Sequence, residues 1–413
     1  MKKFLSLILV AVMIASCFAF VSCDKEGAED TFKLGVICLH DEKSTYDLNF
    51  IEAVKRAQKE LGLKDDQVIF KKNIPESNDC YEAAADLVDQ GCDVIFANSF
   101  GHETYVLKAA KEFKDVEFCH ATGTTAHTEK LDNFHNAFAS IYEGRYLAGI
   151  AAGLKLKEMM EADPTIVPNI GYVGAFTYAE VISGYTSFYL GVKEIVPEVT
   201  MDVQFTGSWY DEIEEKNAAT ALIQKGCVLI SQHADSMGAP SACEERGIPN
   251  VSYNGSTAES CPNTFIVSSK IDWTPYFVLI CEAAQKGEKI PTDYTGTIET
   301  GSVALTEVNE KGAAKDTQKT IDSYKDQLIA GTRKVYETKN FTVTVDEEKK
   351  LNVNATTDEN GHLTSYMADV DSDEAYTPDT EAVEEGVFVE SKYRSAPYFD
   401  LQIDGITLLN AKY

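Results

Sequence analysis

A short pattern that occurs twice is the feature that most constrains how this chain can fold. AAADLVDQGCDVI (83–95) and AATALIQKGCVLI (218–230) carry alanine, leucine, glycine, cysteine and isoleucine at matching places. In each copy the alanine and leucine spacing predicts an amphipathic helix, the glycine a left-handed helix cap, and the apolar run after it a buried strand. Two such helix-to-strand units predict two similar α/β lobes.

The same alternation of short apolar runs and amphipathic stretches extends through most of the chain. Strands are expected at 33–38, 67–70, 94–97, 116–119, 170–173, 201–205, 228–231, 250–253 and 264–267, and helices at 49–61, 78–90, 103–113, 141–159, 179–195, 213–225, 239–246 and 273–286. Strands separated by helices of this length predict parallel sheets with crossover connections. The expected fold class is therefore α/β, with two Rossmann-like lobes.

The domain organisation can be read from breaks in this alternation. We expect a signal peptide at 1–22, a tether at 23–31, lobe 1 at 32–140 with about 272–300, lobe 2 at 141–271 with about 301–333, and a C-terminal extension at 334–413 that docks on the lobes. A helix is expected around 313–330. In the extension, alternating Phe341, Val343 and Val345 predict a strand, and DENG (358–361) predicts a turn.

An acidic run, ADVDSDEAYTPDTEAVEE (368–385), follows that turn. It lacks the glycine and the later bidentate glutamate of an EF-hand loop, so we interpret it as a solvated surface loop and not as a calcium site.

The first residues, MKKFLSLILVAVMIASCFAFVSC, have the layout of a secretory signal that ends in a lipidation site. Cys17 and Cys23 each follow a small residue, as the lipidated cysteine of a bacterial lipoprotein does. The residues before Cys17 match that pattern more closely. Cys23 is preferred because the polar DKEGAED after it makes a solvated tether, whereas lipidation at Cys17 would leave an apolar extension. The expected location is extracytoplasmic, anchored by lipid to the bacterial cell membrane.

Charge and cysteine content narrow the possible partners. The net charge is −29, which repels nucleic acid, so no nucleic-acid partner is expected. No CxxC motif occurs, and several cysteines lie in or beside apolar strand segments, where free cysteine acts as a small hydrophobic side chain. Cys243 and Cys261 flank the same expected strand and are the one pair considered for a disulfide; whether they pair is left open.

The loops after the strands are where a ligand would bind, because the carboxyl ends of parallel strands form the binding crevice. These loops mix aromatic with short polar residues, as in LHDEKSTYDLN, NSFGHE, HATGTTAH, GAFTYAE, GSWYDE, QHADSMG, YNGSTAE and SSKIDW. Aromatic faces and fixed polar groups suit a flat polar ligand. Tyr46 and Trp209, flanked by polar residues, are expected to stack on it, whereas core or rim packing is the favoured role for Phe100 and Phe176.

Signatures of common enzymes and metal sites are missing. GxSxG, the P-loop, HExxH and GxGxxG do not occur. His233 and Asp235 form an HxD pair, but no second pair is spaced to complete a metal site, so ligand contact is the better role for both. No catalytic residue, metal or cofactor is expected.

Several longer segments resemble a known family. ANSFGHETYVLKAAKEFKDVEFCHATG, IYEGRYLAGIAAG, GSWYDEIEEKNAATALIQKGC, QHADS and SSKIDW are similar to the basic membrane protein (BMP) family of ABC-transporter substrate-binding lipoproteins, and SAPYFDLQIDGITLL is similar to its C-terminus. Well-understood members are purine-nucleoside receptors. The resemblance implies a type I periplasmic-binding fold, with a multi-strand hinge and a nucleoside between the lobes. Residues from about 340 to 387 match no part of the family.

The resemblance also implies site residues. Tyr46 and Trp209 would sandwich a base, and the family's asparagine, aspartate and lysine positions fall on Asp47, near Asn254 and on Lys270. Exchanging carboxylate and amide exchanges hydrogen-bond acceptors for donors, which changes the preferred purine or sugar. The expected ligand-binding set is Asp41, Tyr46, Asp47, Asn98, Ser99, Phe100, Phe176, Trp209, Asp235, Asn254 and Lys270.

The expected function is capture of a nucleoside or purine-like ligand by lobe closure, and its delivery to a membrane permease with a separate ATPase. The protein is expected to be a monomer. Three alternatives stay open: a surface receptor or adhesin that uses the extension, an enzyme acting on nucleosides, and a DNA-binding regulator of related fold. The last would need a helix-turn-helix where the signal sequence lies.

Overall fold

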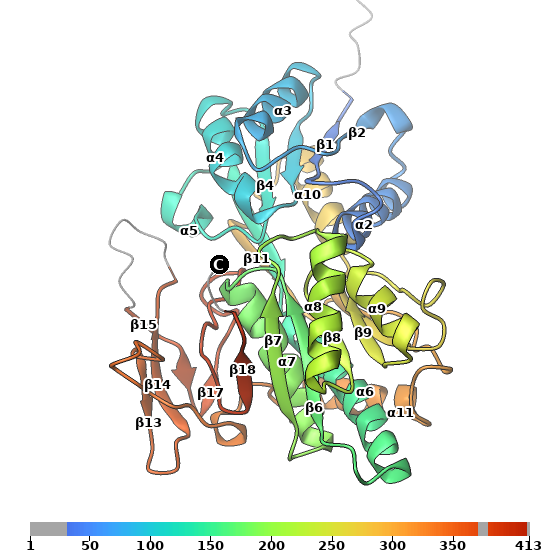
Figure 1. Cartoon of the computed structure of the whole chain (residues 1–413). Helices are drawn as coiled ribbons and strands as arrows, with labels where there is room; N and C mark the ends of the chain where they lie inside the picture. The colour runs from blue at the N-terminus through green and yellow to red at the C-terminus, as the bar shows by residue number, and fades with distance from the viewer. Residues whose placement is uncertain (1–30, 371–378, 411–413) are drawn as a thin grey trace, which may run out of the picture.

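Two parallel sheets, each flanked by helices, dominate the computed structural model, and a smaller β extension lies beside the second sheet (Figure 1). The structure describes residues 31–370 and 379–410. The α/β fold class predicted from the sequence is confirmed. The signal, the tether and Cys23 lie outside the described residues.

The first sheet has the strand order β11-β5-β4-β3-β1-β2, and all its pairs are parallel. Its strands are β1 (Leu34–Ile37), β2 (Val68–Lys71), β3 (Val94–Ala97), β4 (Glu117–Ala121), β5 (Phe134–Ala139) and β11 (Asp293–Gly296). Its helices are α2 (Thr45–Leu61), α3 (Asn78–Asp89), α4 (Glu103–Glu112), α5 (Ala126–Glu129) and α10 (Thr274–Lys286), with 3-10 turns η1 (Asp65–Gln67) and η2 (Phe100–His102). We call this part lobe 1. Its central strands LGVI and VIFA are fully buried, as expected for strands covered on both faces.

The second sheet has the order β12-β10-β9-β8-β6-β7-β18, and only the β10–β12 pair is antiparallel. Its strands are β6 (Asn169–Gly174), β7 (Thr200–Phe205), β8 (Ile230–Gln232), β9 (Asn250–Tyr253), β10 (Phe265–Ile271), β12 (Val303–Leu305) and β18 (Ile406–Leu408). Its helices are α6 (Ile141–Ala162), α7 (Ala179–Ile195), α8 (Glu212–Lys225), α9 (Gly238–Arg246) and α11 (Thr317–Ile329). We call this part lobe 2.

The duplicated pattern contributes one unit to each sheet, α3 with β3 in lobe 1 and α8 with β8 in lobe 2. The glycine after each helix is left-handed, with φ of 78° at Gly91 and 107° at Gly226. A residue with a Cβ is strained in that region, which explains glycine at both positions. The loop that follows each unit leads toward the space between the lobes.

Three chain segments cross between the lobes side by side. The first passes through Ser140 between β5 and α6, the second through Asp272 between β10 and α10, and the third joins β11 to β12. Ser140 N donates to the carbonyl oxygen of Gly296 at 2.8 Å, and Asp272 N to that of Ser302 at 2.7 Å. These bonds tie the crossings into one hinge.

The C-terminal part forms small antiparallel sheets. They comprise β13 (Ala355–Thr357), β14 (Leu363–Ala368), β15 (Thr380–Glu381), β16 (Val383–Glu384) and β17 (Val387–Phe388), preceded by the 3-10 turn η3 (Thr338–Asn340). β18 then pairs in parallel with β7, and Ile406 lies opposite Met201. Tyr336 stacks on Phe399 with ring centroids 4.5 Å apart, so an aromatic contact also holds the extension to itself.

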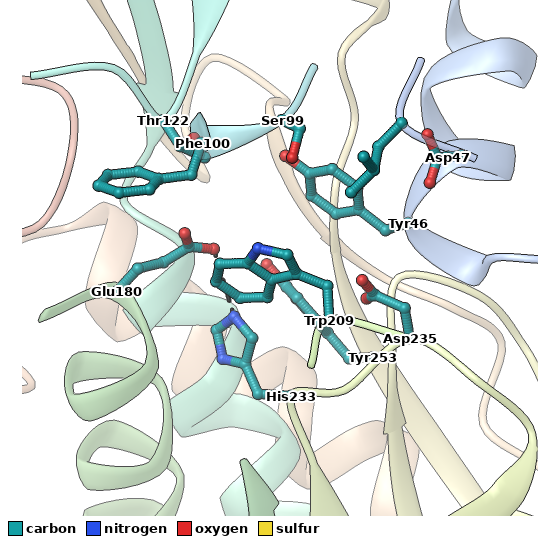
Figure 2. A pocket seen from close by; sticks show the side chains of 11 residues that line it. Tyr46, Asp47, Ser99, Phe100, Thr122, Glu180, Trp209, His233, Asp235 and Tyr253 are labelled. Atoms are coloured by element: carbon teal, nitrogen blue, oxygen red, sulfur yellow. Dashed lines mark hydrogen bonds and ion pairs between the residues drawn. The ribbon is translucent and has the colours of Figure 1, made fainter. Parts of the chain in front are cut away.

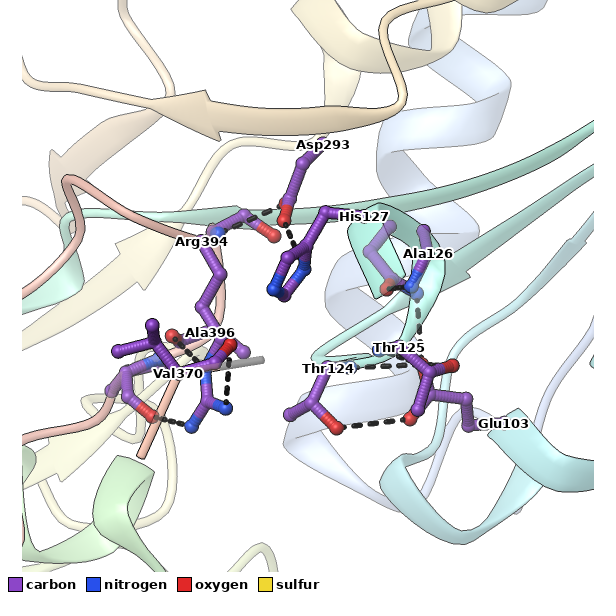
Figure 3. Close-up of polar contacts among 12 residues, drawn as sticks. Glu103, Thr124, Thr125, Ala126, His127, Asp293, Val370, Arg394 and Ala396 are labelled. Atoms are coloured by element: carbon purple, nitrogen blue, oxygen red, sulfur yellow. Dashed lines mark hydrogen bonds and ion pairs between the residues drawn. The ribbon is translucent and has the colours of Figure 1, made fainter. Parts of the chain in front are cut away.

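The extension also reaches lobe 1 (Figure 3). Ser395 N donates to Oδ1 of Asp293, the first residue of β11, at 2.9 Å. Nδ1 of His127 on α5 lies 3.7 Å from the other carboxylate oxygen of Asp293. Beside them, Arg394 donates to the carbonyl oxygens of Val370 and Ala396.

One sequence-based expectation is wrong in this part of the chain, and the open question of a disulfide near α9 is answered. Residues 341–345 form no strand, because their backbone groups bond to unrelated parts of the chain. Val343 N donates to the carbonyl oxygen of Gly361, whereas the carbonyl oxygen of Thr342 accepts from Asp404 N. Cys243 and Cys261 are both free and buried, and do not form a disulfide. The DENG turn is present, since Gly361 N donates to the carbonyl oxygen of Asp358 at 3.1 Å.

Candidate functional site

A pocket lies between the lobes where the loops of both sheets meet (Figure 2). It encloses about 370 Å³ of space free of atoms, part of it open to solvent. The residues that line it are Leu39, Tyr46, Asp47, Ser99, Phe100, Thr122, Glu180, Trp209, His233, Asp235 and Tyr253. Four aromatic rings and three carboxylates therefore surround one space.

The first turn of α2 supplies Tyr46 and Asp47. Ser44 caps this helix, because its side chain accepts from Asp47 N at 3.1 Å, and the cap fixes where the two side chains point. Asn98 holds both in place: its carbonyl oxygen accepts from the Tyr46 hydroxyl at 2.6 Å, and its amide donates to Asp47 Oδ1 at 2.7 Å. The other oxygen of Asp47, Oδ2, is buried without a hydrogen-bond partner among the described residues.

Loops after β3 and β4 complete the wall from lobe 1. Ser99 donates to Glu76 at 2.6 Å, and its carbonyl oxygen lies 2.7 Å from Nε2 of His120. Phe100 begins η2 and reaches across the cleft, where its ring lies 5.1 Å from that of Tyr178 in lobe 2. Phe100 is therefore a contact between the lobes as well as a lining residue.

The opposite wall is built around Trp209, in the loop between β7 and α8. The ring of Phe176 packs edge-on against the indole at 4.9 Å, and Tyr178 lies 5.9 Å from it. The backbone of Trp209 also orients the next loop, since its carbonyl oxygen accepts from Asp235 N at 2.9 Å. Phe176 thus supports the indole from the side and does not itself line the pocket.

Beneath the pocket, a buried arginine on α6 contacts two lining residues. Arg145 is 1% exposed, and it donates to Nδ1 of His233 and to the carbonyl oxygen of Gln232, both at 2.9 Å. Its guanidinium carbon lies 3.4 Å from the ring centroid of Tyr253. On the other side of His233, Nε2 lies 3.3 Å from Glu180 (Figure 2).

The electrostatics of the pocket favour the protonated form of Asp235, which can donate as well as accept a hydrogen bond. Burial raises the pKa of Asp235 well above its usual range, and the charges of Glu215, Asp47 and Glu180 raise it further. Burial and the charge of Arg145 lower the pKa of His233 to about 4, so this imidazole is neutral at physiological pH. No lysine or arginine occurs among the residues that line the pocket, so an anionic ligand would meet repulsion.

The lobes touch at the mouth of this pocket. Thr45 of lobe 1 donates twice to the carbonyl oxygen of Asp235 in lobe 2, from its backbone amide at 3.1 Å and from its hydroxyl at 3.2 Å. The rings of His40 and Tyr210 lie 5.5 Å apart across the same gap. The structure is therefore in a closed arrangement of the lobes.

The structure brings together six of the residues expected from the sequence to bind ligand, and separates five. Tyr46, Asp47, Ser99, Phe100, Trp209 and Asp235 line the pocket. Asn98 and Phe176 stand behind lining residues, as described above. Asp41 is not a lining residue; its carboxylate accepts from Lys43 N at 3.0 Å in the loop before α2. Asn254 and Lys270 line a separate cavity between α2 and the ends of β9 and β10.

Five lining residues were not in the expected set: Leu39, Thr122, Glu180, His233 and Tyr253. Each lies in or beside a loop that follows a strand, so the position of these loops was the available signal. Sequence reasoning did not select Glu180 and Tyr253 because they face the pocket only once α7 and β9 are placed in three dimensions. His233, expected from the HxD pair to contact ligand, does line the pocket.

In the part of the chain that the structure describes, neither a metal site nor a helix that could span a membrane is present. Within it, no group of three or more His, Cys, Asp or Glu side chains is placed to hold a metal ion. No helix in residues 31–370 and 379–410 is long and apolar enough to cross a membrane.

A pocket closed between two parallel α/β lobes that share a three-segment hinge defines a solute-binding protein of the type I periplasmic-binding fold. The model of the Bmp family, described as PnrA-like ABC transporter substrate-binding proteins, matches residues 38–339, and this chain belongs to that family. It is therefore an extracytoplasmic binding protein and not an enzyme. The matched residues include both walls of the pocket and exclude most of the extension.

Similar proteins agree with this placement. A purine-binding protein of Brucella abortus (strain 2308) is 31% identical over 279 residues, covering 67% of this chain and 75% of that protein. A protein provisionally named an ABC transporter glucose-binding protein, from Haloferax volcanii, is 32% identical over 215 residues, and the chain spans about half its length (52%). The solved structure of a solute-binding protein from Aeropyrum pernix K1 matches with a TM-score of 0.63 at 17% identity, covering 78% of this chain and 95% of that one. This last likeness concerns the fold alone.

Proposed function

We propose that this protein captures a purine nucleoside or a purine-like ligand between its lobes and delivers it to the permease of an ABC importer. The observation that carries the proposal is the pocket itself, where Tyr46, Phe100, Trp209 and Tyr253 surround one space together with three carboxylates. Aromatic faces suit a flat base, and carboxylates accept from ring N–H, amino and ribose hydroxyl groups. The purine-binding relative supports the same ligand class.

The charge of the pocket separates a nucleoside from a nucleotide. Asp47, Glu180 and Asp235 line the pocket with no lining lysine or arginine to balance them. A phosphate would lie beside the acidic side chains of Asp47 and Glu180, and like charges in an interface cost several kcal/mol. We therefore expect nucleosides to bind and the corresponding monophosphates to be rejected.

A hexose is the second candidate, because of the relative named for glucose. Sugars also combine an apolar face with many hydroxyl donors, which the same aromatic and carboxylate groups could receive. One hexose is too small to contact all four aromatic rings that line the pocket, so a nucleoside is the better fit.

Isothermal titration calorimetry tests the proposal. The panel is inosine, guanosine, adenosine, cytidine and uridine, with guanosine monophosphate as the anionic control and glucose as the competing sugar. We expect the purine nucleosides to bind and the monophosphate to bind at least tenfold more weakly. Binding of glucose alone, or silence across the nucleosides, would overturn the proposal.

We also propose that a lipid on Cys23 anchors the protein to the cell membrane and that the mature protein is a monomer, with no nucleic-acid partner. The support is the signal-like sequence that ends at Cys23. Mass spectrometry of the mature N-terminal peptide tests the anchor: a diacylated peptide that starts at Cys23 is expected, and one that starts at Cys17 would contradict it. Light scattering of the purified protein reports the oligomeric state.

A further inference from the structure

We propose that Arg145 is a positioning residue for this pocket, which fixes His233 in the tautomer with its proton on Nε2 and thereby directs an N–H at Glu180. Arg145 does not line the pocket, so it can affect a ligand only through the lining residues that it contacts. The proposal rests on the pocket being the ligand site proposed above. It does not rest on the ligand being a nucleoside.

The hydrogen bonds determine the tautomer. An arginine side chain has only donors, so its contact with Nδ1 of His233 at 2.9 Å requires Nδ1 to be the acceptor. In a neutral imidazole the proton must then be on Nε2, which lies 3.3 Å from an oxygen of Glu180. The chain of donors thus runs from Arg145 through His233 to Glu180.

The surroundings hold this arrangement rigidly. Arg145 and His233 are 1% and 2% exposed, and the second guanidinium bond, to the carbonyl oxygen of Gln232, fixes the plane of the fork. The same guanidinium lies over the ring of Tyr253, which contributes a cation–π contact. A side chain on Gly184 of α7 would come within 2.9 Å of Nδ1, so this helix packs directly against the imidazole.

The consequence for the ligand is that the hydrogen-bond donors and acceptors at the base of the pocket are fixed. With its proton directed at Glu180, His233 orients that carboxylate, so Glu180 presents an acceptor to the ligand. Without Arg145, His233 could reverse its tautomer or take up a proton. The titratable and charged groups that face the pair are Glu180 from α7, Tyr172 from β6, Tyr253 from β9 and Asp235 from the same loop.

The test compares Arg145→Met and Arg145→Lys with the unchanged protein. NMR of the protein labelled with ¹⁵N-histidine reads the tautomer and pKa of His233 without any ligand. In Arg145→Met we expect a higher His233 pKa, because the neighbouring positive charge is lost while Glu180 remains, and a mixture of tautomers. Arg145→Lys keeps the charge and a donor but not the planar fork, so the pKa should stay low and the proton should stay on Nε2.

Calorimetry with inosine then gives the effect on binding. Losing a buried charged hydrogen bond predicts roughly tenfold weaker binding in Arg145→Met, with a new dependence on pH between about 5 and 7, and a smaller loss in Arg145→Lys. Arg333→Met is the matched control: Arg333 donates to Tyr146 at 2.9 Å and lies over Tyr324, but is remote from the pocket. Its inosine affinity should not change.

The outcomes separate this proposal from the proposed function. Unchanged His233 tautomer and pKa in a folded Arg145→Met variant would overturn the positioning role, whatever binds. If inosine does not bind the unchanged protein, the nucleoside proposal fails, while the NMR comparison still decides the role of Arg145. Should Arg145→Met not fold, Arg145→Gln decides it in its place: the His233 pKa should rise, and an unchanged pKa and tautomer there would overturn the proposal.

Discussion

The backbone amide and the hydroxyl of Thr45 both donate to the carbonyl oxygen of Asp235, at 3.1 and 3.2 Å, across 190 residues of chain and across the cleft. Thr45 begins α2 in lobe 1, and Asp235 follows β8 in lobe 2. These two bonds join the lobes beside two lining residues, Tyr46 and Asp235. Closure of the cleft and formation of the pocket are therefore one event.

Thr45→Val should weaken closure without altering the pocket lining. The substitution removes one of the two bonds, worth about 0.5–1.5 kcal/mol, so ligand affinity should fall roughly two- to tenfold, mainly through faster dissociation. Stopped-flow fluorescence of Trp209 gives the rates. Thr320→Val, which removes a hydroxyl bond to Asp316 within α11, is the control and should leave both rates unchanged.

Trp209→Ala should remove most of the ligand affinity. Aromatic side chains at the centre of a binding site commonly contribute 2 kcal/mol or more, so a loss of roughly thirtyfold or greater is expected. Trp209→Phe should retain part of it, since Phe176 would still support a smaller ring. Tyr393→Ala, at an exposed position of the extension, serves as the control in the same calorimetric titrations. Equal affinity in Trp209→Ala and the parent would show that the indole does not contact ligand.

The buried Glu390 predicts how stability depends on pH. Burial raises its pKa to about 7, while its carboxylate accepts from Ser183 at 2.5 Å. A carboxyl with a raised folded-state pKa binds protons more tightly when folded, so it lowers the unfolding free energy as pH rises from about 4.5 to 7.

Glu390→Gln should remove that dependence. The variant should match the parent near pH 4.5 and exceed its unfolding free energy by up to about 3 kcal/mol above pH 7. Urea denaturation at several pH values measures the difference. Glu310→Gln, at an exposed position, should change neither end of the curve. A constant offset between Glu390→Gln and the parent at all pH values would contradict the assignment.

Asp293→Ala should release the extension from lobe 1. The substitution leaves the buried amide of Ser395 without its acceptor, at a cost of about 1–3 kcal/mol. Hydrogen exchange should accelerate around residues 393–398, while exchange in β7, which pairs with β18, stays slow. The exposed Asp66→Ala is the control. Unchanged exchange near Ser395 would show that this contact does not hold the extension.

Much of the scaffold could be predicted because local pattern and fold agree. The expected strands at 94–97 and 250–253 coincide with β3 and β9, and the expected helix at 179–195 coincides with α7. The strands that were not predicted are different. β5 (FHNAFA) has polar residues within it, yet all six positions are buried, because Asn136 bonds to Glu103 and Ala126. β11 and β18 are short, and they become strands only by pairing with β5 and β7, which are far away in sequence.

The residues of the candidate site can also be divided into those that the sequence predicts and those that it does not. Tyr46, in the first turn of α2, and Trp209, in the loop after β7, line the pocket and were predictable from the mixture of aromatic and polar residues around them. Asn254 directly follows β9 and Lys270 lies near the end of β10, but both line a different cavity, whose place depends on how these strands sit against α2. Arg145 could not be selected at all, because its role depends on α6 passing beneath two loops of lobe 2.

The pairing of β18 with β7 has a consequence for how the chain acquires its structure. Met201 of β7 pairs with Ile406 of β18, and in lobe 1 Asn136 of β5 pairs with Asp293 of β11. The second strand of each pair is synthesised much later than the first, so neither sheet is complete when its first strands emerge from the ribosome. Such distant pairings slow folding and leave β7 as an open edge, available to other chains in the meantime. An exported protein of this design gains from staying unfolded until translocation is over, because only then can the last strands pair with the first ones.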